Sequence, residues 1–104
     1  MNPWPALFAR LPQLVDKLEA IAHPLLTVEV DGEIVARLVR PSRADLEAHA
    51  RWPGMPTHTP EGWLLEALSK VRRYYPEPQG RVALYAGSQP VAQVRRREGV
   101  GHAA

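Results

Sequence analysis

The sequence predicts an α+β domain in which two β-hairpins form a four-stranded antiparallel sheet and three helices lie mainly on one face. Two observations lead to this fold class. Apolar residues alternate on both sides of a turn signal twice, around residues 31–32 and around residues 87–89. Segments with apolar residues three and four positions apart precede each hairpin. The order helix, hairpin, two helices, hairpin packs most simply as two layers.

Length and composition fit one folded domain. The chain has 104 residues, of which 45% are hydrophobic and 23% are charged, and a chain of this size forms a single core. We expect one domain over residues 1–98 and a disordered tail over residues 99–104. The chain has no cysteine, which excludes disulfides, thiolate catalysis and cysteine-ligated zinc.

The first segment has the pattern of a helix with an early break. Asn2 is a good cap, whereas Pro12 would kink a continuous helix. We therefore predict a short opening turn, then a helix from Pro12 to about Ala22 that ends before Pro24. The apolar face of this segment consists of Leu7, Leu11, Leu14, Leu18 and Ile21.

The register of the first hairpin depends on the length of its turn. A two-residue turn at Asp31-Gly32 would turn the apolar residues of the second strand away from those of the first. A three-residue connection pairs Val30 with Ile34 and Val28 with Ala36, so that the apolar side chains share one face. We favour the three-residue connection.

Two helices are expected between the hairpins. Ser42 is a good N-cap, and Asp45 stands three residues later as in a capping box. Thr59 caps the next helix, with Pro60 at its first position. The apolar stripe of that helix consists of Trp63, Leu64, Ala67, Leu68, Val71 and Tyr75.

The second hairpin is expected to have a three-residue turn at Gly87-Ser88-Gln89. This register turns one set of side chains toward the helices: Val82, Leu84, Ala86, Ala92 and Val94. It turns the other set away from them: Ala83, Tyr85, Val91, Gln93, Arg95 and Arg97. The two hairpins also resemble each other at a spacing of 56 positions, which matches Val35 with Val91, Ala36 with Ala92 and Arg40 with Arg96.

Arginine residues beside an aromatic ring on the outer sheet face are typical of single-strand nucleic-acid binding. The candidate contacts on the sheet are Arg81, Tyr85, Arg95 and Arg97, and those at the end of the third helix are Arg72 and Arg73. The alternative is a solvated strand end, because arginines also discourage edge-to-edge strand pairing and favour helix C-termini.

Exposed apolar residues point instead to a protein interface. A connector rich in tryptophan and proline, residues 52–63, and several valines on the open sheet face are expected to meet a partner. The candidate interface residues are Trp52, Met55, Trp63, Val35, Val39 and Val91. The alternative for the tryptophans is a purely structural role, in which they pack the connector against the body of the domain.

The sequence predicts no enzyme. It has four scattered histidines and no phosphate loop, nucleophile elbow or zinc-binding histidine pair, so we expect no catalytic residues, no metal and no cofactor. No apolar run is long enough for a membrane span and no secretory leader is recognisable, which predicts a cytoplasmic protein without a membrane partner.

We therefore expect a small, non-catalytic regulatory protein that binds protein and forms a homodimer or another homo-oligomer. The alternative is a nucleic-acid-binding regulator that uses the arginines and Tyr85.

Overall fold

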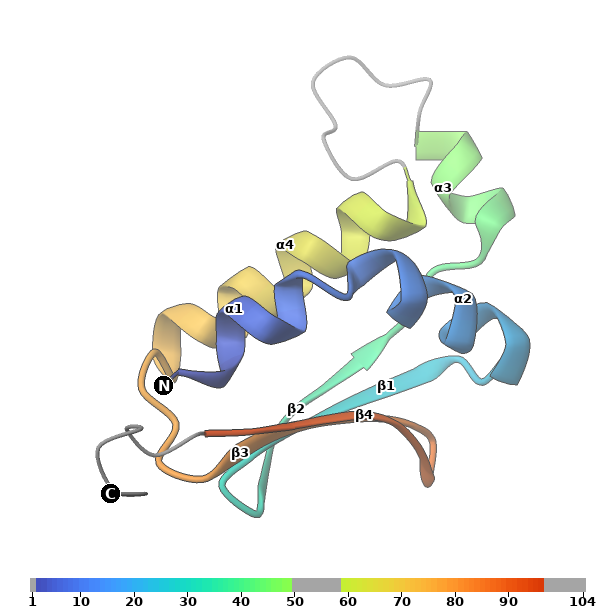
Figure 1. The fold of residues 1–104 in the computed structure, drawn as a ribbon. Helices are drawn as coiled ribbons and strands as arrows, with labels where there is room; N and C mark the ends of the chain where they lie inside the picture. Colours follow the sequence, from blue (N-terminus) through green and yellow to red (C-terminus); the bar gives the residue numbers. More distant parts are fainter. Residues whose placement is uncertain (1, 50–58, 97–104) are drawn as a thin grey trace.

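A computed structural model of the chain describes residues 2–49 and 59–96, and it confirms the predicted α+β fold. The elements in chain order are α1 (Pro3–Phe8), α2 (Leu11–Ile21), β1 (Leu25–Val30), β2 (Glu33–Val39), α3 (Arg43–His49), α4 (Pro60–Tyr74), β3 (Arg81–Ala86) and β4 (Gln89–Arg95). The strands form one antiparallel sheet in the order β2-β1-β3-β4. Helices α1, α2 and α4 lie on the same side of this sheet (Figure 1).

The predicted break near Pro12 separates α1 from α2. The Oδ1 atom of Asn2 accepts a hydrogen bond from the backbone N–H of Trp4 at 2.9 Å and caps α1. Pro12 lies in the first turn of α2, where its missing N–H costs little. The indole of Trp4 is fully buried, and its Nε1–H donates to the carbonyl of Tyr75 at 2.7 Å, which ties α1 to the end of α4.

The caps expected for α3 and α4 are both present. The backbone N–H of Asp45 donates to the hydroxyl of Ser42, and the N–H of Ser42 donates to the Asp45 carboxylate, which completes a capping box. The hydroxyl of Thr59 accepts from the N–H of Gly62 at 3.0 Å. Pro60 occupies the first turn of α4, as predicted.

Both hairpin turns are one residue shorter than predicted. In the first hairpin, Val30 pairs with Glu33 across a two-residue turn. Asp31 and Gly32 both have positive φ, 53° and 87°, which is typical of a type I′ turn. In the second hairpin, residue 86 pairs with residue 89, and Gly87 at the first turn position has a φ of 62°.

A β-bulge in each hairpin restores the pairing expected further along the strands. The register shifts after Val28 in one hairpin and after Leu84 in the other, so that Val28 still pairs with Ala36 and Leu84 with Ala92. The extra residue of each bulge is a valine, at positions 35 and 91. The alternation of apolar residues in the sequence does not reveal such an insertion. One extra residue in a strand moves the residues between the turn and the bulge to the opposite face of the sheet.

The two hairpins are related by a pseudo-two-fold axis through the middle of the sheet. Strand β3 begins 56 positions after β1, and β4 begins 56 positions after β2, at the same lengths. The central pair Val28 and Leu84 occupies equivalent positions. The bonds that join the hairpins repeat as well, since Asp31 N–H donates to the Arg81 carbonyl and Gly87 N–H donates to the Leu25 carbonyl, both at 2.9 Å.

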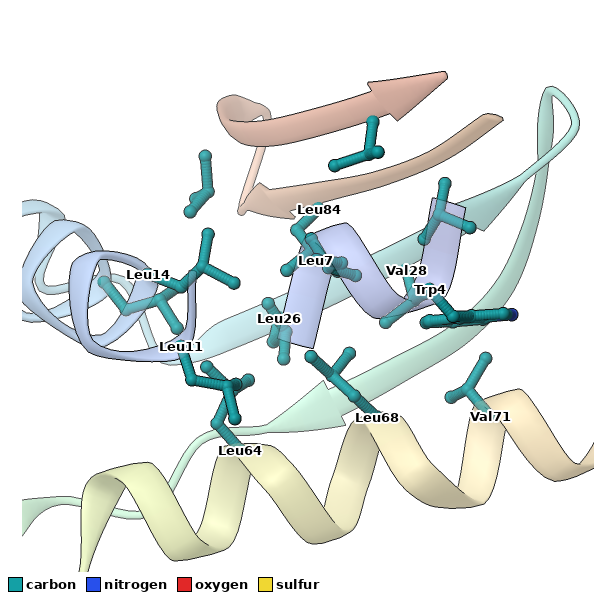
Figure 2. Close-up of a cluster of buried hydrophobic side chains, with 14 of the residues drawn as sticks. Trp4, Leu7, Leu11, Leu14, Leu26, Val28, Leu64, Leu68, Val71 and Leu84 are labelled. Atoms are coloured by element: carbon teal, nitrogen blue, oxygen red, sulfur yellow. The ribbon is translucent and has the colours of Figure 1, made fainter. Parts of the chain in front are cut away.

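The core lies between the sheet and the helices, where the predicted inward faces meet (Figure 2). Leu64 and Leu68 of α4 point toward the sheet, and Val28 and Leu84 lie at its centre. The buried core residues that the sequence pattern placed on these faces include Leu7, Leu11, Leu14, Leu18, Leu64, Leu68, Val71, Val82, Leu84, Ala86 and Val94. No helix in the described ranges is long and apolar enough to cross a membrane.

Candidate functional site

The predicted interface valines occupy three different environments. Val39, near the end of β2, is 77% exposed. Val35 is half-buried and packs against the core. Val91 is only 3% exposed, so the expectation that it lies on the outer face is wrong. The β-bulges explain why Val35 and Val91 are less exposed than expected, because each bulge inserts one of these valines so that it packs with the core.

The tryptophan-proline connector is described only at its end. Trp52 and Met55 lie outside the described residues. Trp63 is half-buried on α4 and packs against the core cluster, while its side chain also borders a surface groove beside β2. Trp63 therefore packs against the body of the domain and also borders the surface, so it fits both alternatives that the sequence analysis offered for it.

Several of the predicted basic residues have partners within the chain. The guanidinium of Arg81 forms a salt bridge of 2.7 Å with Glu29 on the neighbouring strand. Arg72 lies over the ring of Phe8, 5.5 Å from its centroid. Arg73 and Arg95 are exposed, Tyr85 is half-buried, and Arg97 lies outside the described residues.

The outer face of the sheet holds two exposed residues that the sequence interpretation did not select. Ile34 pairs with Glu29 and is 52% exposed, and Arg37 pairs with Thr27 and is exposed. The three-residue connection favoured from the sequence places Ile34 on the opposite face, whereas the structure has the two-residue turn together with a bulge. The Asp-Gly pair was the available signal, since it favours a two-residue type I′ turn.

The outer edge of β2 is open in the described part of the chain, because β1 is its only neighbour there. The N–H of Arg40 donates to the carbonyl of Pro24 at 2.7 Å. Hydrogen-bonded pairs alternate along an antiparallel ladder, so in the same register Leu38 bonds toward β1. Arg37 and Val39 consequently direct their N–H and C=O groups away from the sheet.

A groove of about 320 Å³ runs between this edge and α4. Strand β2 contributes Leu38 and Val39. Helix α4 contributes Trp63, Ala67, Val71, Glu66 and Lys70. The two charged side chains form an i, i+4 pair with 3.7 Å between the Lys70 Nζ and the Glu66 carboxylate, so the groove is apolar with a neutral rim. In Figure 2, β2 is the strand beside α4.

The hairpin turn that leads into β2 is held in place by the carboxylate of Asp31. Asp31 accepts hydrogen bonds from the backbone N–H groups of Gln79, Gly80 and Arg81 at 2.5 to 3.0 Å. Burial tends to raise the pKa of Asp31, but these three bonds and the charge of Arg96 outweigh it and lower the pKa below its ordinary value. The ionised carboxylate thus holds the first turn against the segment that enters β3.

The described residues offer no assembled metal centre. Among residues 2–49 and 59–96, no three side chains of His, Asp or Glu gather in a way that could hold a metal ion. The Nδ1 atom of His23 accepts the N–H of Leu25 at 3.0 Å, which gives this imidazole a structural partner. The described surface carries an open strand edge, an apolar groove and exposed arginines.

Comparison of the chain with protein-family models, with curated proteins and with solved structures finds no match.

Proposed function

We propose that this is a small, non-catalytic binding protein whose β2 edge pairs with a strand of another polypeptide, a second copy of the chain included. One observation carries the proposal. The outward backbone groups of Arg37 and Val39 lie beside an apolar groove, and the exposed side chains of Val39 and Ile34 flank them. Strand addition uses this combination, since backbone bonds supply affinity and pockets for side chains supply specificity.

A second copy fits this edge because the same surface can serve both partners. An isologous dimer needs a self-complementary patch, and the groove is apolar with its two charges, Glu66 and Lys70, already paired. Strand β2 contains no proline, so nothing removes an N–H from the ladder. The opposite edge, β4, begins with Gln89-Pro90 and is bordered by cations, which suits a second copy of a chain with net charge +2 less well.

The proposal is tested by sedimentation velocity of the wild type and of Val39→Glu over a wide range of concentration. Val39 is exposed, so the substitution leaves the fold intact, but it places a charge in each half of the interface. We expect the dissociation constant of the dimer to rise by about tenfold or more, which corresponds to about 1.4 kcal/mol. Leu65→Glu is the matched control, because Leu65 is 45% exposed on α4 but does not line the groove.

Equal association of Val39→Glu, Leu65→Glu and wild type would contradict the β2 interface. A wild type that stays monomeric at every concentration would remove self-association and leave strand pairing with a different polypeptide. Moderate salt should change the dissociation constant little, because an apolar interface with few charges is weakly screened.

A second candidate function is single-strand nucleic-acid binding on the outer sheet face, and one observation favours it. Arg37, Arg81 and Arg95 all lie on that face together with Tyr85. Glu29 neutralises Arg81, which weakens the case. Fluorescence anisotropy with labelled single-stranded RNA and DNA tests this function: affinity that collapses with salt and falls in Arg37→Ala and Arg95→Ala would support it, and no binding at low salt would contradict it.

A further inference from the structure

A second groove lies at the opposite edge of the sheet, along β4. Two depressions of about 370 and 590 Å³ adjoin each other there and share Arg10 and Gln93 in their walls. Helices α1 and α2 form one wall and β4 forms the other, from Pro90 to Arg95. The combined groove is therefore elongated and follows the strand.

The charge of this groove is of one sign. Its charged lining residues are Arg10, Lys17 and Arg95, and no carboxylate of the described chain lines it. The Nζ atom of Lys17 donates to the neutral carbonyl of Val91 at 3.3 Å, and no salt bridge within the described ranges involves these three cations. The groove thus favours an occupant with negative charge.

The backbone of β4 offers hydrogen-bonding groups to the same groove. The N–H of Arg96 donates to the carbonyl of Gly80 at 2.6 Å, and the pairing of β3 with β4 continues in this register through Val94 and Ala92. Because bonded pairs alternate, Gln93 and Arg95 direct their N–H and C=O groups outward. This part of the edge alternates donors and acceptors as another peptide strand requires.

We propose that an extended acidic peptide binds along β4 as a fifth strand, with its carboxylates facing Arg10 and Lys17 on the helix side. The proposal concerns the opposite edge from β2 and does not depend on self-association. A peptide matches this edge better than a nucleic acid does, for two reasons. Among residues 2–49 and 59–96, no aromatic ring lines the groove to stack on bases, and a sugar-phosphate backbone has no N–H groups to pair with the outward carbonyls of β4.

The test is fluorescence anisotropy with a short labelled peptide of alternating Glu and Thr, capped at both ends. Two matched probes have the same length: one with Lys in place of Glu, and one with Glu retained but alternate backbone amides N-methylated. We expect binding of the Glu probe only, because the Lys probe removes the charge match and N-methylation removes the donors that a strand needs. A labelled oligothymidylate of similar charge is the fourth probe.

Substitutions locate the site. Arg10→Gln and Lys17→Gln should each weaken binding of the Glu probe about two- to fivefold, the range for exposed charge pairs, and Lys17→Arg should restore it. Lys70→Gln is the control, because Lys70 is an exposed cation beside β2. Circular dichroism confirms that the variants fold, and Val39→Glu should bind the Glu probe as the wild type does.

Each of the following results would overturn the proposal. These are equal binding of the Glu and Lys probes, undiminished binding of the N-methylated probe, loss of binding in Val39→Glu or Lys70→Gln, and no binding of the Glu probe at low salt. Stronger binding of the oligothymidylate with loss in Arg10→Gln would also overturn it and assign the groove to phosphate.

Discussion

Gly87, at the turn of the second hairpin, illustrates how one residue constrains the fold. It has a φ of 62°, and a Cβ atom there would lie 2.7 Å from the ring of His23. His23 is not free to move away without cost, because its Nδ1 atom holds the N–H of Leu25. The turn of the second hairpin is thus fitted against the segment that enters the first.

We predict that Gly87→Ala lowers the free energy of unfolding by about 1–3 kcal/mol, because both the backbone conformation and the space disfavour a side chain. Gly32→Ala is the control: its φ is also positive, 87°, but nothing lies within 4 Å of the added Cβ. Urea denaturation of both variants is the measurement. Equal losses in the two variants would contradict a role for the His23 contact.

The burial and the contacts of individual residues were the least predictable part of the candidate site. The sequence indicated that Val39 is exposed and that Val82, Leu84 and Val94 face the core, and burial agrees. It placed Val91 outside, because period-two alternation assigns each residue to one face until a bulge intervenes. The ion pair of Arg81 with Glu29 joins two residues that are 52 positions apart in the sequence, and local patterns carry no information on such a contact.

At the scale of elements, the caps and helix breaks were predictable because they depend on neighbours in sequence. Asn2, Ser42 and Thr59 all cap as expected. The order of the strands was not predictable, since it depends on how the hairpins pack against each other. The sheet places β1 beside β3 at its centre, and this leaves both β2 and β4 as edges with outward backbone groups.

Asp31 connects the turn between β1 and β2 to the segment that enters β3, and its charge makes this connection sensitive to pH. The folded-state pKa is lowered, so the carboxylate contributes stability that is fully present above the unfolded pKa and is lost as pH falls through the folded value. The ordinary value is 3.8, and the loss therefore occurs in the acid range at and below that pH.

We predict that Asp31→Asn destabilises the protein by about 1 kcal/mol at neutral pH, because the amide cannot accept the three backbone bonds as the carboxylate does. Asparagine also tolerates the positive φ at this position, which makes it a matched substitution. Urea midpoints at neutral and acid pH test this. The difference in urea midpoint between wild type and variant should disappear as pH falls. A difference that persists below the folded-state pKa of Asp31 would contradict the role of the charge.

At the scale of the whole molecule, the pseudo-two-fold axis gives the sheet two similar edges in different chemical surroundings. The β2 edge lies beside an apolar groove of α4, with Glu66 and Lys70 paired at its rim. The β4 edge lies beside α1 and α2 in a groove lined by cations. The sheet thus has one edge beside an apolar groove and one beside a basic groove, for which we propose a second copy and an acidic peptide, respectively.

The central claim is that the β2 edge pairs with another strand, and amide hydrogen exchange at low and high protein concentration tests it most directly. The N–H groups of Arg37 and Val39 point away from β1, so in the monomer they exchange rapidly, whereas a dimer that pairs along β2 protects them. We expect their exchange rates to fall with concentration in the wild type but not in Val39→Glu, while the outward amides of Gln93 and Arg95 stay unchanged. Rates at Arg37 and Val39 that do not vary with concentration, in a sample that sedimentation shows to be dimeric, would contradict the account.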